Sequence, residues 1–228
     1  FAGRIPEGVR SFSGLHTVRA NSNRFSGKLP DGLSRWQEVL EIEFKDNSLA
    51  GPLPLRARHI VELFLSRNQL AGTLSRQLLM SIALKRVRFA YNKFSGSLPG
   101  ATQACKEFIV NDNLFQGTLP SIKTWSNLVS FSATRTLIEG TIPEGLGYCE
   151  KHVNFNLNGL THEGTVPSTV GRMSVHGSAL AFGSGLVGTF PNVQGTVHVL
   201  SMWGNALEGH SPKLHITARS SAMLVHSN

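Results

Sequence analysis

The chain has 228 residues, of which 40% are apolar and 16% charged, with a formal net charge of +8. A chain of this length and apolar content can bury a continuous core, which excludes a disordered polar tail. No stretch approaches the roughly eighteen apolar residues that a membrane helix needs, so we predict no membrane insertion for this segment.

An apolar residue, a variable residue and a glycine recur along the chain. The glycines of this motif are 21 to 24 residues apart: Gly3, Gly27, Gly51, Gly72, Gly96, Gly117, Gly140, Gly164, Gly188 and Gly209. In most repeats an apolar residue and a proline follow, as in Ile5-Pro6, and the proline marks a turn that leaves an extended segment. The period predicts a repeat solenoid.

The pattern L-x-x-L-x-L-x-x-N precedes most of these glycines, as in Ile60, Leu63, Leu65 and Asn68. Apolar residues that alternate in this way indicate a short strand with one buried face, so each repeat should contribute one strand. We predict one parallel sheet in sequential order, with strands at about 15–20, 39–44, 60–65, 84–89, 107–110, 128–133, 152–157, 178–182 and 197–202.

An asparagine follows most of the predicted strands, and its amide can pair with backbone groups that a tight turn leaves unpaired. We predict a ladder of such bonds from Asn23, Asn47, Asn68, Asn92, Asn113 and Asn205. The equivalent positions of three later repeats hold Thr136, Leu160 and Ser184, so residues 134–185 should form a weaker or irregular stretch.

The repeat unit L-x-x-L-x-L-x-x-N-x-L/F-x-G-x-L/I-P resembles the plant-type leucine-rich repeat over residues 1–212. This type occurs in ectodomains of plant receptor kinases, in polygalacturonase inhibitors and in surface antigens of trypanosomatid parasites. The resemblance implies a curved parallel β-sheet of about nine to ten repeats, mostly β and irregular, at the cell surface or outside the cell. Residues 213–228 lose the period and are predicted to form a degenerate tail. The chain begins inside a repeat at Phe1 and ends in this stretch without a polar capping element, which predicts a fragment of a longer protein.

The excess of positive charge lies in the first half of the chain, where residues 1–100 hold 15 Lys and Arg against 7 Asp and Glu. Such a patch could attract nucleic acid, an anionic membrane or an acidic protein. The predicted register places Arg86 between Glu62 and Glu107, so opposite charges on neighbouring strands account for much of it. We therefore favour a protein or peptide partner over nucleic acid. The sequence leaves the oligomeric state open.

No catalytic or metal-binding pattern emerges. Residues 183–188 match G-x-G-x-x-G, but Phe190-Pro191 follows where a dinucleotide site would need a helix. The nine histidines lack metal-ligand spacing, and Cys105 and Cys149 fall two strand steps, about 10 Å, apart, too far for a disulfide. We predict a protein that is not an enzyme and needs no cofactor or metal.

The concave face of the predicted sheet supplies the candidate binding site. Aromatic residues and arginines concentrate in repeats 3 to 5, which nominates Phe64, Arg67, Arg86, Arg88 and Tyr91, with Phe182 and Trp203 as a reserve spot. Two alternatives stay open. Phe64 and Tyr91 could simply pack on each other, and the repeats could be a structural spacer without a ligand.

Overall fold

A computed structural model describes most of the chain. The residues described are 1–11, 14–31, 33, 36, 38–54, 59–79, 82–100, 104–121, 127–145, 154–158, 164–172, 178–180, 183–192, 199–202, 204–208 and 222–224. The predicted positions Cys149, Leu160, Phe182 and Trp203 lie outside these residues.

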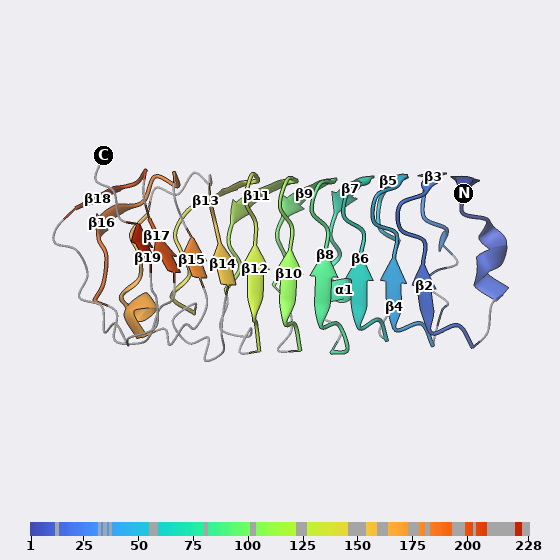
Figure 1. Ribbon diagram of the computed structural model, residues 1–228, viewed down its shortest axis with the longest axis horizontal. Helices are drawn as coiled ribbons and strands as arrows, with labels where there is room; N and C mark the ends of the chain where they lie inside the picture. The colour runs from blue at the N-terminus through green and yellow to red at the C-terminus, as the bar shows by residue number, and fades with distance from the viewer. Residues whose placement is uncertain are drawn as a thin grey trace.

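Ten short strands form one parallel sheet in sequential order along the length of the molecule (Figure 1). They are β2 (Thr17–Arg19), β4 (Glu41–Glu43), β6 (Glu62–Phe64), β8 (Arg86–Arg88), β10 (Glu107–Ile109), β12 (Ser130–Ser132), β14 (Asn154–Asn156), β15 (Ser178–Leu180), β17 (Val199–Ser201) and β19 (Ala222–Leu224). The first nine lie within the ranges predicted from sequence, so the predicted sheet and its order are confirmed. Strand β19 pairs with β17 and lies in the segment for which we predicted a degenerate tail.

The prediction of one strand per repeat is wrong, because the motif that ends in glycine forms a second parallel sheet. It contains β1 (Ala2–Arg4), β3 (Arg24–Gly27), β5 (Ser48–Gly51), β7 (Gln69–Thr73), β9 (Lys93–Ser97), β11 (Leu114–Thr118) and β13 (Leu137–Glu139), while β16 (Val187–Thr189) and β18 (Ala206–Glu208) form a separate pair. About seven turns of the solenoid contribute a strand to both sheets, somewhat fewer than the nine to ten repeats predicted. Among the described residues, the seven-stranded sheet ends at β13, within the stretch where the asparagine ladder is interrupted.

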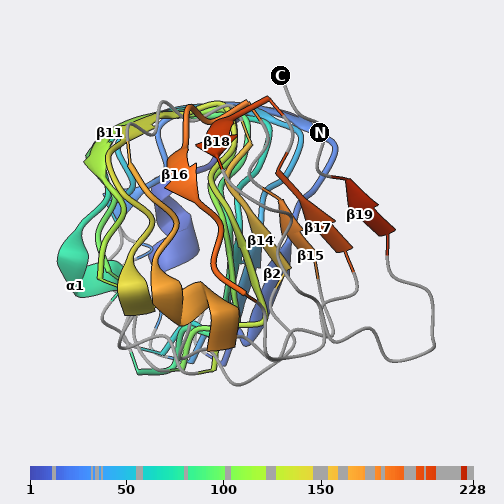
Figure 2. The same ribbon diagram turned by 90° about the vertical axis from the view of Figure 1, so that its left-hand side faces the viewer.

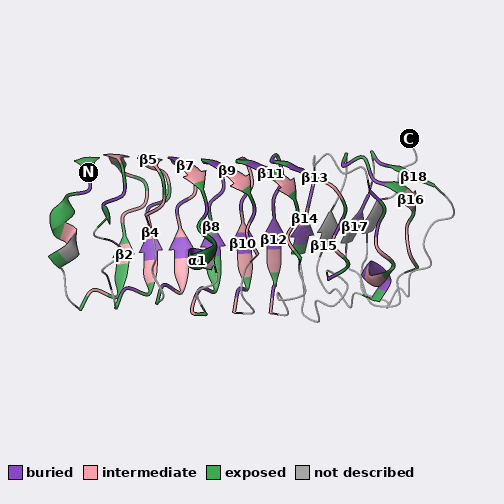
Figure 3. Ribbon diagram, turned by 180° about the vertical axis from the view of Figure 1, so that it is seen from behind, coloured by how far each residue is buried: buried purple, intermediate pink, exposed green. Residues whose placement is uncertain are grey.

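Viewed along its length, the solenoid is a closed coil (Figure 2). The ten-stranded sheet forms one side, the second sheet crosses the top, and the described helical segments lie opposite the first sheet. These segments are η1 (Glu7–Ser11), α1 (Arg76–Leu79) and η5 (Ser168–Arg172). Each described strand of the long sheet from β4 to β10 buries its middle residue and turns its outer residues away from the core (Figure 3).

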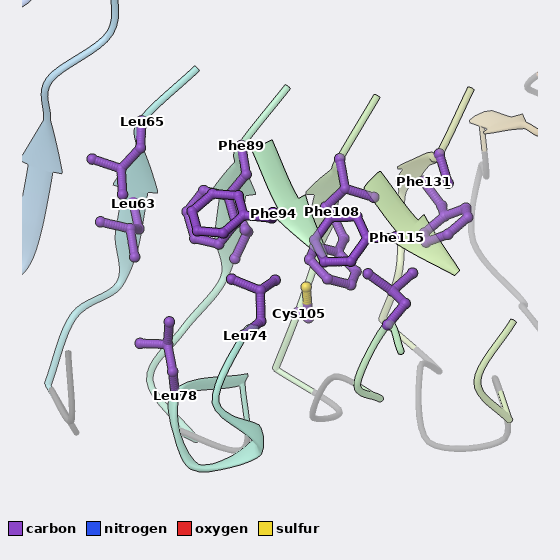
Figure 4. Close-up of a cluster of buried hydrophobic side chains, with 14 of the residues drawn as sticks. Leu63, Leu65, Leu74, Leu78, Phe89, Phe94, Cys105, Phe108, Phe115 and Phe131 are labelled. Atoms are coloured by element: carbon purple, nitrogen blue, oxygen red, sulfur yellow. The ribbon is translucent and has the colours of Figure 1, made fainter. Parts of the chain in front are cut away.

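Stacked phenylalanines form the centre of the core (Figure 4). The rings of Phe94 and Phe115 lie 6.3 Å apart on the second sheet, and those of Phe131 and Phe155 lie 5.0 Å apart on the long sheet. Because each repeat packs only on its neighbours, such columns carry the cohesion of the solenoid. Five of the six predicted asparagines lie at the turn that connects the two sheets, and Asn205 lies at the equivalent turn between β17 and β18.

The carboxamide of Asn92 shows how this turn is held. Its Nδ2 donates to the carbonyl oxygens of Leu65 at 2.9 Å and Phe89 at 3.0 Å, and its Oδ1 accepts from the Leu70 amide at 3.0 Å. Asn68 and Asn113 repeat this pattern with equivalent backbone groups one repeat earlier or later. Each buried asparagine thus links its own repeat to the preceding one.

Hydroxyl groups replace part of this pattern where the ladder is interrupted. Thr136 donates to the carbonyl of Ala133 at 2.9 Å, which reproduces the bond within the repeat. Ser184 is fully buried and donates to the carbonyl of Leu157 at 3.0 Å, which reproduces the bond to the preceding repeat. We expected serine to be a poor substitute for asparagine at this position, yet its hydroxyl makes one of the hydrogen bonds that an asparagine makes there.

The thiol of Cys105 is unpaired and buried in the core. Burial raises its pKa from 9.0 to about 12, so the native thiol stays protonated where an unfolded thiol ionises. The unfolded state therefore binds fewer protons between pH 9 and 12, and this group lowers the free energy of unfolding as the pH rises through that window. We expect a loss on the order of 1 kcal/mol per pH unit, measured by urea unfolding, that is absent from Cys105→Val. The same slope in both proteins would contradict this assignment.

Candidate functional site

The exposed face of the ten-stranded sheet, called the concave face below, brings the predicted residues of three strands together. The register places Glu62, Arg86 and Glu107 side by side in one row. Phe64 and Arg88 lie side by side in the row above. The predicted order of charges across these strands is thus confirmed.

Ion pairs fix the arginines of this face. Arg86 pairs with Glu62, and this hydrogen bond is the main reason that the Arg86 pKa is raised. Arg88 binds Glu107 through two bonds, from Nε at 2.8 Å and from Nη2 at 3.1 Å. Although Arg86 lies between both glutamates, as predicted, Arg88 forms the ion pair with Glu107.

A second row of side chains lies just before the ladder position of each repeat, where the backbone is left-handed. Its φ values are 55° at Ser22, 54° at Asp46, 58° at Arg67, 58° at Tyr91, 52° at Asp112 and 52° at Arg135. Glycine takes this position later in the chain, at Gly183 and Gly204. A left-handed residue other than glycine costs about 1 kcal/mol. Six repeats therefore keep a side chain at a position where glycine would cost less.

Three members of this row form a cation–aromatic stack around Tyr91. The guanidinium carbon of Arg67 lies 5.0 Å from the centre of the Tyr91 ring, and that of Arg135 lies 5.9 Å from it. Arg135 also donates to the Tyr91 hydroxyl at 3.1 Å and to Asp112 at 2.5 and 2.7 Å. The bond to Asp112 is the main cause of the raised Arg135 pKa.

The sequence reasoning missed Arg135, although a signal was available. It occupies the same repeat position as Arg67 and Tyr91, directly before the ladder residue, but a threonine replaces the asparagine there. The same repeat also carries Ser130, Ser132 and Thr134, of which the last two are buried.

Phe64 contacts arginines instead of the other aromatic residue of the site. The guanidinium carbons of Arg88 and Arg86 lie 4.8 and 5.8 Å from its ring centre. Among the described residues, ring pairs join core phenylalanines, and none joins Phe64 to Tyr91. The alternative in which these two rings only pack on each other is thus wrong. The concave face instead presents two aromatic rings, each beside two cations.

Other predicted features belong to the scaffold. The stretch 183–188 leads into strand β16 instead of a helix, so its G-x-G-x-x-G pattern is a repeat landmark.

Within the described residues, no group of three or more His, Cys, Asp or Glu could hold a metal ion. No helix among them is long and apolar enough to cross a membrane. The reserve pair Phe182 and Trp203 stays a prediction, since it lies outside the described residues.

Known structures share this fold. No family model and no curated protein matches the sequence. The chain has the leucine-rich-repeat fold of plant receptor ectodomains. A plant peptide hormone receptor, RGFR1 in complex with RGF2, aligns with a TM-score of 0.81 and 20% identity, over 92% of this chain and 39% of that one. The Arabidopsis receptor kinase HAESA, in complex with the peptide hormone IDA and the co-receptor SERK1, aligns with a TM-score of 0.76 and 22% identity, over 84% and 33%.

A third similar structure is not described as a receptor. It is a plant ice-binding protein with a TM-score of 0.66 and 18% identity, over 96% of this chain and 81% of that one.

The chain spans well under half the length of the two receptor structures, as the aligned shares of 39% and 33% show. At these identities the similarity establishes the fold.

Proposed function

We propose that the chain is a non-catalytic recognition module that binds a protein or peptide on its concave face. Phe64, Arg88 and Tyr91 form the centre of the site, with Arg67, Arg86 and Arg135 around them. We further propose that it is the extracellular part of a larger receptor-like protein of the plant-type repeat family, as the resemblance of its repeats and the receptor ectodomains of similar fold suggest.

One observation carries this proposal: arginine and aromatic side chains are held together on an exposed face. Tyr91 is 44% exposed and makes contacts with two arginines, although its left-handed backbone costs free energy. Tyrosine and arginine supply much of the binding energy at protein interfaces. Side chains fixed before binding lose little conformational freedom when a ligand arrives, which favours affinity.

The double variant Arg88→Ala, Tyr91→Ala tests the proposal. Displayed random peptides of about twelve residues, selected on the unaltered chain, serve as the probe. We expect the variant to bind the selected peptides more weakly than the parent, with a loss of more than about 2 kcal/mol in binding free energy measured by calorimetry. Its melting midpoint should change little, because alanine and tyrosine meet a similar left-handed backbone cost and both side chains are exposed.

The control is Gln69→Ala, Lys93→Ala, which trims two exposed side chains of the second sheet. Its affinity should equal that of the parent. The proposed concave site is wrong if no peptide is enriched, or if the Arg88→Ala, Tyr91→Ala variant binds as tightly as the parent. Either result would favour a spacer role.

A further inference from the structure

The donors that the concave arginines leave unused identify the kind of ligand group that fits them. A guanidinium has five N–H groups, and each carboxylate of this face approaches from the Nε and Nη2 side. Arg88 meets Glu107 this way, and Arg135 meets Asp112 with Nη2 also bonded to Tyr91. Among the described residues, the Nη1 groups of both arginines have no acceptor.

The arginines lie outermost and the acids beneath them. The side chains of Arg86, Arg88 and Arg135 are 46%, 48% and 64% exposed, whereas their acidic partners are 20%, 18% and 21% exposed. A ligand that reaches this face therefore meets N–H donors before it meets carboxylate oxygens.

The paired charges cancel. The ion pairs among the described residues lie on strands of the long sheet or in the turns directly after them, and together they use six basic and six acidic side chains: Arg19, Lys45, Arg67, Arg86, Arg88 and Arg135 with Glu41, Glu43, Asp46, Glu62, Glu107 and Asp112. Arg19 holds two carboxylates, but Arg86, Arg88 and Arg135 hold one each, and a second carboxylate there would lie close to the first, where like charges repel. A neutral acceptor avoids this repulsion.

We infer, on the basis of the proposed function, that the concave face selects an extended peptide stretch without acidic side chains. The outer N–H groups of Arg86, Arg88 and Arg135 donate to its main-chain carbonyl oxygens. The acids hold the arginines in place and cancel their charge, so they exclude acidic ligands. The net positive charge of the chain lies outside this set of pairs, for example at Lys85, Lys93 and Arg24.

The test compares displayed random peptides selected on the unaltered chain and on the variant Glu62→Gln, Glu107→Gln. Glutamine keeps the shape of glutamate and removes its charge, so the variant face is positive. We expect neutral peptides from the parent and acidic peptides from the variant. The control Glu139→Gln, Glu144→Gln makes the same change of charge away from the concave face and should select the same neutral peptides as the parent.

Synthetic copies of the selected peptides complete the test. Those from the parent should bind equally well with a C-terminal carboxylate or amide, and their Kd should change less than about three-fold between low and high salt. Acidic peptides from the parent, or a Kd that depends steeply on salt, would overturn this inference and leave the concave binding site in place. No enrichment at all would overturn both.

Discussion

Replacing Phe131 by alanine is expected to lower the free energy of unfolding by about 3 to 5 kcal/mol. The Phe131 ring is fully buried, and its centre lies 6.1 Å from that of Phe108 and 5.0 Å from that of Phe155. Its removal opens a cavity between neighbouring repeats, and a repeat that packs only on its neighbours has no other contacts to compensate. Urea unfolding followed by circular dichroism measures the loss.

Leu137→Ala is the matched control, because it removes an apolar side chain of the same repeat that is 58% exposed. A change within about 0.5 kcal/mol is expected there. Similar losses in both variants would show that the phenylalanine column does not carry the cohesion of the solenoid.

The second large effect is expected from Asn92→Ala, at about 3 kcal/mol. Alanine keeps the backbone but leaves the Leu70 amide without its acceptor and removes one of two carboxamide donors from each of the Leu65 and Phe89 carbonyls. Asn92 is 8% exposed, so water replaces these bonds poorly. Asn68→Ala should behave in the same way, since its bonds are equivalent.

Ser184→Ala is the comparison for the ladder. It removes the side-chain bond to the Leu157 carbonyl and should cost less, about 1 kcal/mol. Equal losses at Asn92 and Ser184 would contradict the view that the carboxamides act as a ladder between repeats.

The fold was predictable because the same physical requirement recurs in most repeats. Most described glycines of the motif have a positive φ, and Gly96 with φ 78° has no room for a Cβ, which would lie 2.8 Å from Cγ2 of Thr73. Such a requirement leaves a regular trace in the sequence. The second sheet escaped prediction because its strands contain or border these glycines and lead toward prolines, and both residues are typical of turns.

The candidate site was predictable only in part. Alternation along the strands placed Phe64, Arg86 and Arg88 on one face, and the glutamates of neighbouring strands indicated their partners. The left-handed row was not predicted, because tyrosine and arginine are unusual in that conformation and reveal it only when the repeats are aligned. Arg135 was missed for this reason, and its contact with Tyr91 spans two repeats.

Hydrogen exchange of the chain with a selected peptide tests the central claim, that the concave face is the binding site. We expect slower exchange of backbone amides around β6, β8 and β10 and in the turns that hold Tyr91 and Arg135, with little change in β7 and β9 of the second sheet. Protection confined to the second sheet, or the same protection in the Arg88→Ala, Tyr91→Ala variant, would contradict the account.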